Sequence, residues 1–227
     1  DLERFAYVAS HDLQEPLRMV TSFTQLLAKK YKGTLDASAD EFIGYAVEGA
    51  TRMQRLIEDL LEYSRVSAQR PATIDVQASR SLETALKNIH VVVKQRAAII
   101  TSDPLPVVRA NPGQLVLVFQ NLLSNAIKFT HPLQPRVHVS VERADQHWVF
   151  SVTDQGIGIE PKHFDRLFVM FQRLNSREDF PGNGIGLAVC KVIIEQQRGR
   201  IWVESTPGVG TTVRFSLPAA AEGGTTP

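Results

Sequence analysis

At residues 10–18 the chain reads Ser10-His11-Asp12-Leu13-Gln14-Glu15-Pro16-Leu17-Arg18. Apolar side chains recur every three or four residues through this stretch and on both sides of it, at Phe5, Ala9, Leu13, Pro16, Val20, Phe23 and Leu27. This spacing is typical of a helix that packs lengthwise on other helices. His11 falls nearly opposite the centre of the stripe, on a face shared with Gln14, Glu15 and Arg18. We therefore predict a long helix with an exposed histidine.

An exposed imidazole beside a carboxylate has two interpretations. His11 and Asp12 alone would be read as part of a solvated polar face. Alternatively, Asp12 accepts the imidazole proton and holds the tautomer whose other nitrogen acts as a nucleophile. Pro16 removes a backbone donor and crowds the carbonyl group of Asp12, so the helix is expected to bend or loosen within a turn of His11.

Composition narrows the class of protein. The 227 residues are 43% hydrophobic and 22% charged, which is ordinary for a globular protein. A net charge of +1 implies no nucleic-acid partner and no anionic membrane surface. The single cysteine, Cys190, excludes an internal disulfide and fits a reducing compartment. No apolar run approaches the roughly 18 residues of a membrane span. We therefore predict a soluble, cytoplasmic fragment without membrane contact, and its start inside a helical pattern suggests that an upstream part is missing.

A second helix is predicted directly after the first. The first should end near Lys32-Gly33, and Asp36 to Asp40 offer N-cap residues for the next. That helix carries a seam directed back at the first helix, formed by Phe42, Ala46, Ala50, Met53, Ile57, Leu60 and Ser64. Two antiparallel helices cannot bury apolar stripes on both sides, so we predict a homodimer that forms a four-helix bundle. The alternative is that residues 1–70 pack on the downstream domain instead.

The periodicity changes after Arg70-Pro71-Ala72, which marks the predicted domain boundary. Helices are predicted at residues 79–95, from Asn111-Pro112 to about 129, and at 185–197. Short strands are predicted at residues 74–76, 98–101, 106–109, 136–143, 147–154, 200–204 and 211–217. Segregated helices with adjoining antiparallel strands indicate a two-layer α/β sandwich at residues 71–218. Residues 219–227 are small and polar, and are predicted to form a flexible tail.

Three groups of residues in this second region carry chemistry. Asn121, Asn125 and Lys128 recur on one face of a helix, and their oxygens and cation suit a magnesium-bound polyphosphate. Asp154 ends a strand before Gly156 and Gly158, where its carboxylate can accept a hydrogen bond from an exocyclic amine such as that of adenine. A third group opens a helix, whose N-terminus is a natural phosphate site, at Gly182, Gly184, Gly186 and Leu187. Solvated amides or ordinary glycine turns explain each group alone, but less readily all three in this order.

Taken together, these motifs make the whole chain resemble the catalytic core of a two-component sensor histidine kinase. Residues 11–17 are similar to the histidine box of phytochrome-type kinases. The family's boxes match, in order, residues 10–18 (phospho-acceptor), 121–129 (N), 154–159 (first glycine), 168–171 (F) and 182–187 (second glycine). The resemblance implies a dimerisation and phosphotransfer hairpin, followed by an ATP-binding sandwich of the Bergerat type that is shared with gyrase and heat-shock chaperones.

The resemblance also implies roles for individual residues. Asn121 and Asn125 would hold Mg²⁺, Lys128 would approach the phosphates, and Asp154 would bind adenine with support from Thr211. Residues 160–183 would form a lid over ATP, with Arg166, Phe168, Phe171 and Arg173. The other ATP-binding residues implied by the resemblance are Gly156, Gly158, Gly182, Gly184, Gly186 and Leu187.

The expected reaction follows from one replacement. The hydrolytic relatives carry a glutamate that activates water at the position of Asn121, and an amide cannot take a proton. The γ-phosphoryl group should therefore pass to His11, with Asp12 as base or orienting group, and then to an aspartate of a response regulator receiver. Glu15 stands where many kinases have Thr or Asn, so a protein acting mainly as a phosphatase of that regulator is the alternative. An upstream sensory module, with a bilin chromophore, is also implied. The intact motifs disfavour a pseudokinase. Asn121, which replaces the base of the hydrolytic relatives, disfavours an ATP-driven clamp.

Overall fold

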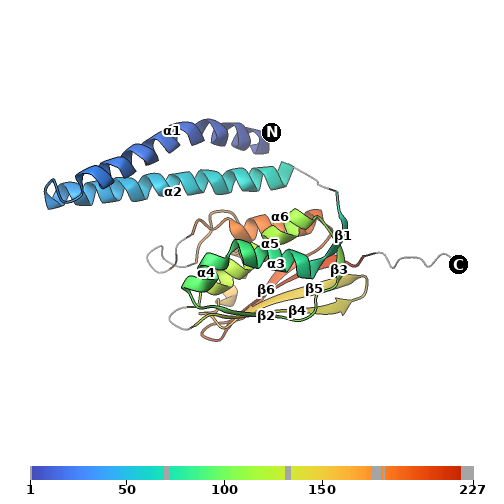
Figure 1. The fold of residues 1–227 in the computed structure, drawn as a ribbon. Coiled ribbons are helices and arrows are strands. Elements are labelled where there is room, and N and C mark those ends of the chain that lie inside the picture. The colour runs from blue at the N-terminus through green and yellow to red at the C-terminus, as the bar shows by residue number, and fades with distance from the viewer. Residues whose placement is uncertain (1, 69–71, 131–133, 175–179, 181, 221–227) are drawn as a thin grey trace. The chain divides into compact units, whose positions relative to one another are not determined.

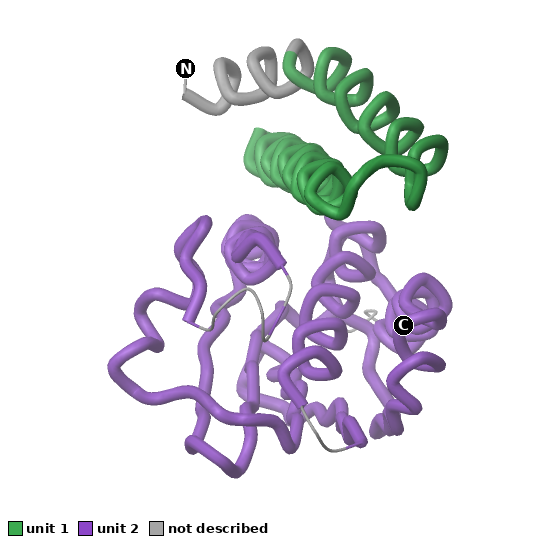
Figure 2. Tube along the Cα trace, turned by 90° about the vertical axis from the view of Figure 1, so that its left-hand side faces the viewer, with its two compact units in different colours: residues 1–69 green, residues 70–227 purple. Residues whose placement is uncertain are grey.

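The chain separates into two compact units, residues 1–69 and 70–227 (Figure 2). The computed structural model describes residues 2–68, 72–130, 134–174, 180 and 182–220, with side chains in the first helix described from Leu13 onward. Each unit is considered by itself.

Unit 1 is a helical hairpin of α1 (Leu2–Tyr31) and α2 (Ala37–Ala68), drawn in blue to cyan in Figure 1. α1 continues through Pro16 without a break, and its path curves along its length (Figure 1). Gly33 adopts a φ of 73° in the connection, and its N–H donates to Asp40 Oδ2 at 2.9 Å. Asp36 Oδ1 accepts the N–H of Ala39 at 2.7 Å. Two carboxylates from the start of α2 therefore hold the turn closed, and Asp36 acts as the N-cap residue of α2.

The apolar stripe predicted for α1 does not face α2. Val20, Phe23 and Leu27 are 46–57% exposed, whereas Thr21 is 5% exposed. The side chains that are partly or fully buried lie one residue further along, at Gln14, Leu17, Thr21, Thr24, Ala28 and Tyr31, so the prediction that Gln14 lies on an exposed face is wrong. Because one residue turns a helix by about 100°, the predicted stripe lies on a neighbouring face.

The same shift corrects the predicted seam of α2. Phe42, Ala46 and Met53 are exposed, while Ile43 and Val47 are partly buried and Ala50 is buried. The predicted seam is therefore wrong at Phe42, Ala46 and Met53, whereas its other members, Ala50, Ile57, Leu60 and Ser64, are partly or fully buried. The spacing of apolar residues in the sequence locates an apolar stripe on a helix, but it does not identify the neighbouring element that covers the stripe.

Unit 2 is the predicted two-layer α/β sandwich (Figure 1). Its main sheet has the order β2-β4-β5-β7-β6, in which β2 is parallel to β4 and the other neighbours are antiparallel. A separate antiparallel pair joins β1 and β3. The strands are β1 (Ile74–Gln77), β2 (Ile99–Ser102), β3 (Val107–Ala110), β4 (Arg136–Ala144), β5 (His147–Asp154), β6 (Ile201–Thr206) and β7 (Gly210–Pro218). The helices are α3 (Ala78–Asn88), α4 (His90–Gln95), α5 (Pro112–Lys128), the 3₁₀ helix η1 (Pro161–Arg166) and α6 (Gly186–Gln196).

Two of the sequence predictions for unit 2 need correction. The helix predicted over residues 79–95 is two helices, α3 and α4, because the chain leaves helical geometry at Ile89 (φ −98°, ψ 10°). The predicted tail begins too early, since Ala219 pairs with Val108 and its N–H donates to the carbonyl oxygen of Gln146 at 2.9 Å. Residues 221–227 lie outside the described part of the chain.

The core lies between the sheet and its helices. α5 begins at Pro112, and Asn111 caps it by accepting the N–H of Gln114 at 3.1 Å. Phe119 of α5 meets Phe150 of β5 and Phe215 of β7, with ring centroids 4.9–6.1 Å apart and no exposed surface on any of the three. These contacts fix α5 over the middle of the sheet.

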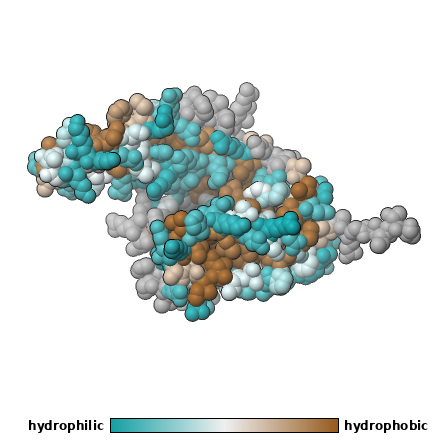
Figure 3. Space-filling model, in the orientation of Figure 1, coloured by the Kyte–Doolittle hydropathy of each residue, from teal (hydrophilic) through white to brown (hydrophobic). Residues whose placement is uncertain are grey.

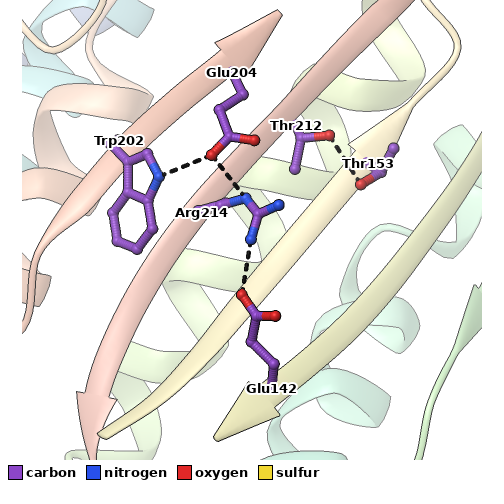
Figure 4. Close-up of polar contacts among 6 residues, drawn as sticks. All are labelled: Glu142, Thr153, Trp202, Glu204, Thr212 and Arg214. Carbon is purple, nitrogen blue, oxygen red and sulfur yellow. Dashed lines mark hydrogen bonds and ion pairs between the residues drawn. The ribbon is translucent and has the colours of Figure 1, made fainter. Parts of the chain in front are cut away.

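The opposite face of the sheet is polar (Figure 4). Arg214 of β7 donates to Glu142 of β4 at 2.9 Å and pairs with Glu204 of β6 at 3.1 Å. The arginine therefore reaches across Ser151 of the intervening β5, which is only 6% exposed. Among the described helices, none is both long and apolar enough to cross a membrane.

Candidate functional site

Asp154 ends β5 with its carboxyl group partly buried. Its Oδ1 accepts the N–H of Gly156 at 2.8 Å and the N–H of Thr211 at 3.2 Å. Burial raises the pKa of this carboxyl from 3.8 to about 6, although the two backbone hydrogen bonds act to lower it. Within the described chain no donor reaches Oδ2. Asp154 therefore holds one acceptor oxygen in place and presents the other for a ligand.

The loop that follows Asp154 requires its two glycines. A Cβ on Gly156 would lie 2.6 Å from the carbonyl oxygen of Phe129. Gly158 has a φ of 68°, and a Cβ there would overlap the carbonyl group of Thr206. The N–H of Gly208 donates to Ile157 O at 2.8 Å. This loop is thus clamped between the end of α5 and the β6–β7 turn.

Ser205 of β6 joins the same region and was missed by the sequence analysis. Its hydroxyl group accepts the N–H of Ile159 at 2.9 Å and donates to Gly210 O at 2.7 Å. It also lies 3.0 Å from Thr211 Oγ1. The stretch from 205 to 210 reads as an ordinary turn, and only the non-local pairing of loop and strand gives this serine its partners.

Asn121, Asn125 and Lys128 lie along one face of α5 and are all partly buried. Asn121 Nδ2 donates to Leu117 O at 3.2 Å, and its Oδ1 lies 2.7 Å from where a Cβ on Gly186 would stand. The side chain of Asn125 has no hydrogen-bond partner among the described residues. The Asn121 amide oxygen therefore lies beside the start of α6, and the three residues share one face of α5.

Lys128 is the cation of this face. Burial and the charge of Arg173 lower the pKa of its ammonium group from 10.5 to about 8. Its Nζ lies 4.3 Å from the centroid of the Phe129 ring, and 2.7 Å from where a Cβ on Gly182 would stand. A side chain on Gly182 would have to displace this ammonium group, which is the far end of a flexible side chain.

The segment leading into α6 carries the predicted lid residues and glycines. Gly184 has a φ of 73°, and its carbonyl oxygen accepts the N–H of Phe171 at 3.1 Å. Phe171 is half exposed with a φ of 60°, and Phe168 is partly buried. Gly186 and Leu187 form the first turn of α6, and both are partly buried. Arg166 donates to Gln172 Oε1 at 2.7 Å, and Arg173 to Phe180 O at 2.7 Å. Residues 175–179 and 181 lie outside the described chain.

The predicted nucleophile and base are on α1. The side chains of His11 and Asp12 lie outside the described part of the structure, and Glu15 is exposed. Unit 2 can therefore be judged alone: it combines an acceptor for an amine, a cation and a helix N-terminus, which suit the base and the phosphates of a nucleotide.

The amides on α5 are also the candidate ligands for a metal ion. Within the described residues no group of three or more His, Cys, Asp or Glu side chains could hold a metal. Mg²⁺ takes oxygen ligands, commonly with substrate phosphates completing its coordination. Asn121 supplies such an oxygen beside Gly186 in the first turn of α6, and Asn125 supplies a second on the same face of α5, so they fit a cation that arrives with a polyphosphate.

Comparison with known proteins agrees with this geometry. Residues 110–221 match the family model "Histidine kinase-, DNA gyrase B-, and HSP90-like ATPase". Residues 1–69 match the "His Kinase A (phospho-acceptor) domain". The crystal structure of full-length ShkA in complex with AMPPNP is similar in fold, with a TM-score of 0.71 at 24% identity over 96% of this chain and 46% of that one.

Two similar curated proteins are cyanobacterial. The chain is 51% identical to cyanobacterial phytochrome A of Nostoc sp. strain PCC 7120, over 96% of its own length and 28% of the relative's. It is 45% identical to phytochrome-like protein Cph1 of Synechocystis sp. strain PCC 6803, over 96% of its own length and 29% of the relative's. The chain thus spans less than a third of these relatives. It belongs to the sensor histidine kinases and corresponds to the catalytic core of that family.

Proposed function

We propose that this chain binds ATP with Mg²⁺ and transfers the γ-phosphoryl group to His11. The observation that carries the proposal is the free acceptor oxygen of Asp154 at one end of a site whose other parts are Lys128 and the first turn of α6. The exocyclic amine of adenine can donate to the Asp154 oxygen, while Lys128 and the N-terminus of α6 favour the negative charge of phosphates.

Each residue has a distinct task in this reaction. Asn121 and Asn125 hold the Mg²⁺, which neutralises charge on the phosphates when bound. Lys128 stabilises the same charge. A ring nitrogen of His11 forms a bond to the γ-phosphorus while the bond to the β–γ bridging oxygen breaks, so ADP leaves; Asp12 accepts the proton from the other ring nitrogen. Asn121 has no basic group that could activate water, which favours transfer over hydrolysis.

A homodimer explains the exposed apolar faces of unit 1. Leu13, Val20, Phe23 and Leu27 are each at least 46% exposed on α1, and Phe42 and Met53 are exposed on α2. Figure 3 shows apolar side chains at the surface of this hairpin. A second copy would cover such stripes in a four-helix bundle, with the faces already buried within each hairpin completing the core. The domain names follow from this: residues 1–70 for dimerisation and phosphotransfer, and 71–218 for ATP binding.

The phosphoryl group on His11 then has an aspartate of a response regulator receiver as its acceptor. We assign contact with the receiver to residues 19–25 of α1 and 52–55 of α2. The names of the phytochrome relatives support an upstream sensory module. A bilin chromophore in that module and a cytoplasmic location are parts of the same proposal. The alternative function is that of a phosphatase of the response regulator. Glu15 is exposed, and a carboxylate there can orient water for dephosphorylating the regulator.

The test is incubation with Mg²⁺ and γ-labelled ATP, beside His11→Ala. Label that survives base and is lost in acid, on the parent alone, is the expected result. Should the parent bind ATP and remain unlabelled, the kinase proposal fails, and a phosphorylated receiver would then test the phosphatase alternative. Asp154→Asn serves as a second control, since it keeps His11 but removes the acceptor for the base.

A further inference from the structure

The hydroxyl group of Ser205 has a complete set of hydrogen bonds, which fixes the direction of each. A carbonyl oxygen only accepts, so the bond to Gly210 O at 2.7 Å uses the single proton of the serine hydroxyl. A backbone N–H only donates, so Ser205 Oγ accepts from Ile159 at 2.9 Å. With its proton already used, Ser205 can only accept from its remaining neighbour.

That neighbour is the hydroxyl group of Thr211, 3.0 Å from Ser205 Oγ. Thr211 must therefore donate its own proton to Ser205. Its remaining lone pairs can then only accept hydrogen bonds. The backbone N–H of Thr211 donates to Asp154 Oδ1 at 3.2 Å, so Thr211 is a direct neighbour of the carboxylate.

The consequence is a site edge made only of acceptors. Asp154, when ionised, accepts and cannot donate, and Thr211 is held in the accepting state by Ser205. A 6-amino purine presents a donor to such an edge. A 6-oxo purine presents a carbonyl oxygen instead, and two facing acceptors leave both without a partner.

We propose that Ser205 is a positioning residue for base selectivity, which orients the Thr211 hydroxyl and thereby makes the site reject 6-oxo purines. The inference rests on the proposed ATP site and deepens it. Without the Ser205 hydroxyl group, Thr211 is free to rotate and donate. A 6-oxo purine then gains a donor, while an amino purine loses a fixed acceptor.

The test compares the affinities for ATP and inosine triphosphate, which lacks the 6-amino group and carries an oxygen there. In Ser205→Ala, the preference for ATP over inosine triphosphate should fall about tenfold, through weaker ATP binding and unchanged or tighter inosine triphosphate binding. Ser205→Thr keeps a hydroxyl group and should retain the parent's preference.

Ser216→Ala is the matched control. Ser216 Oγ accepts the N–H of Arg200 at 2.9 Å, so this variant also removes a serine hydroxyl that joins β6 to β7, at the end of the strands away from Asp154. It should leave the preference unchanged. An equal loss of affinity for both nucleotides in Ser205→Ala would overturn the inference, as would no change.

Two further results keep the test decisive. If Ser205→Ala does not fold, Thr211→Val removes the oriented hydroxyl itself and should lower the same preference; an unchanged preference there also overturns the inference. If the parent binds neither nucleotide, the proposed ATP site has failed rather than the role of Ser205.

Discussion

Replacing Asp154 by asparagine should stabilise unit 2 at neutral pH while it weakens nucleotide binding. The pKa of Asp154 is raised by burial from 3.8 to about 6, so the folded state binds the proton more tightly than the unfolded state. Stability from this group is present at low pH and is lost as the pH rises from about 4 to about 6. At pH 7 the ionised carboxylate then costs about 3 kcal/mol, because each tenfold change in proton affinity corresponds to ~1.4 kcal/mol.

Asparagine fits the site without this cost. Both backbone donors, Gly156 and Thr211, bond Oδ1, and the amide oxygen of an asparagine can accept both. Its NH₂ group would then stand where Oδ2 is, facing the exocyclic amine of the base. Two donors facing each other should weaken ATP binding by roughly 30- to 100-fold, or about 2–3 kcal/mol.

The assay is urea unfolding of parent and Asp154→Asn at pH 4.5 and 7.5. Titrations common to both proteins cancel in the difference between their free energies of unfolding. From pH 4.5 to pH 7.5, the free energy of unfolding of Asp154→Asn should rise by about 2 kcal/mol relative to that of the parent. A difference that stays constant, or that turns against Asp154→Asn as the pH rises, would refute the reasoning.

Other substitutions test the clamp, the cation and the core of unit 2. Gly158→Ala combines a positive φ with an overlap between the new Cβ and the Thr206 carbonyl group, and should lower the free energy of unfolding in urea by at least ~2 kcal/mol. Gly208→Ala has a similar φ of 76° but open space around it, and should lower the same free energy by about 1 kcal/mol. Because the pKa of Lys128 is about 8, nucleotide affinity should fall as the pH rises from 7.5 to 9.5 in the parent but stay level in Lys128→Gln, as measured by titration calorimetry. Gln197 Oε1 accepts the main-chain N–H of Asn111 at 3.1 Å. Gln197→Leu removes this acceptor and should lower the free energy of unfolding by ~1–3 kcal/mol. Equal stability of the variant and the parent would contradict this.

Local signals in the sequence were enough for most elements of unit 2. Asn111-Pro112 marks the start of α5, because the cap and the proline act within one turn. The spacing of Asn121, Asn125 and Lys128 likewise depends only on helix geometry. Residues whose partners are near in the chain were therefore predictable.

Features that depend on distant partners were not predictable in the same way. The stripe predicted for α1 has the right period, but the side of α1 that is buried lies one residue further along, at Thr21. Ser205 finds Ile159 across 46 residues of sequence, and nothing local distinguishes it from other turn serines. Whether His11 and Asp12 act as predicted stays open to the labelling experiment.

The strand order has a consequence for how the protein is made on the ribosome. β7 lies between β5 and β6, although it follows both in the chain. Until residues 210–218 have left the exit tunnel, β5 and β6 have no common neighbour, and Asp154 lacks the backbone donor of Thr211. The helical hairpin of residues 1–69, by contrast, is complete early. Under the proposed function, a nascent chain would present the helix that carries His11 well before its nucleotide site contains the Thr211 donor, so phosphorylation of His11 would wait until β7 is translated.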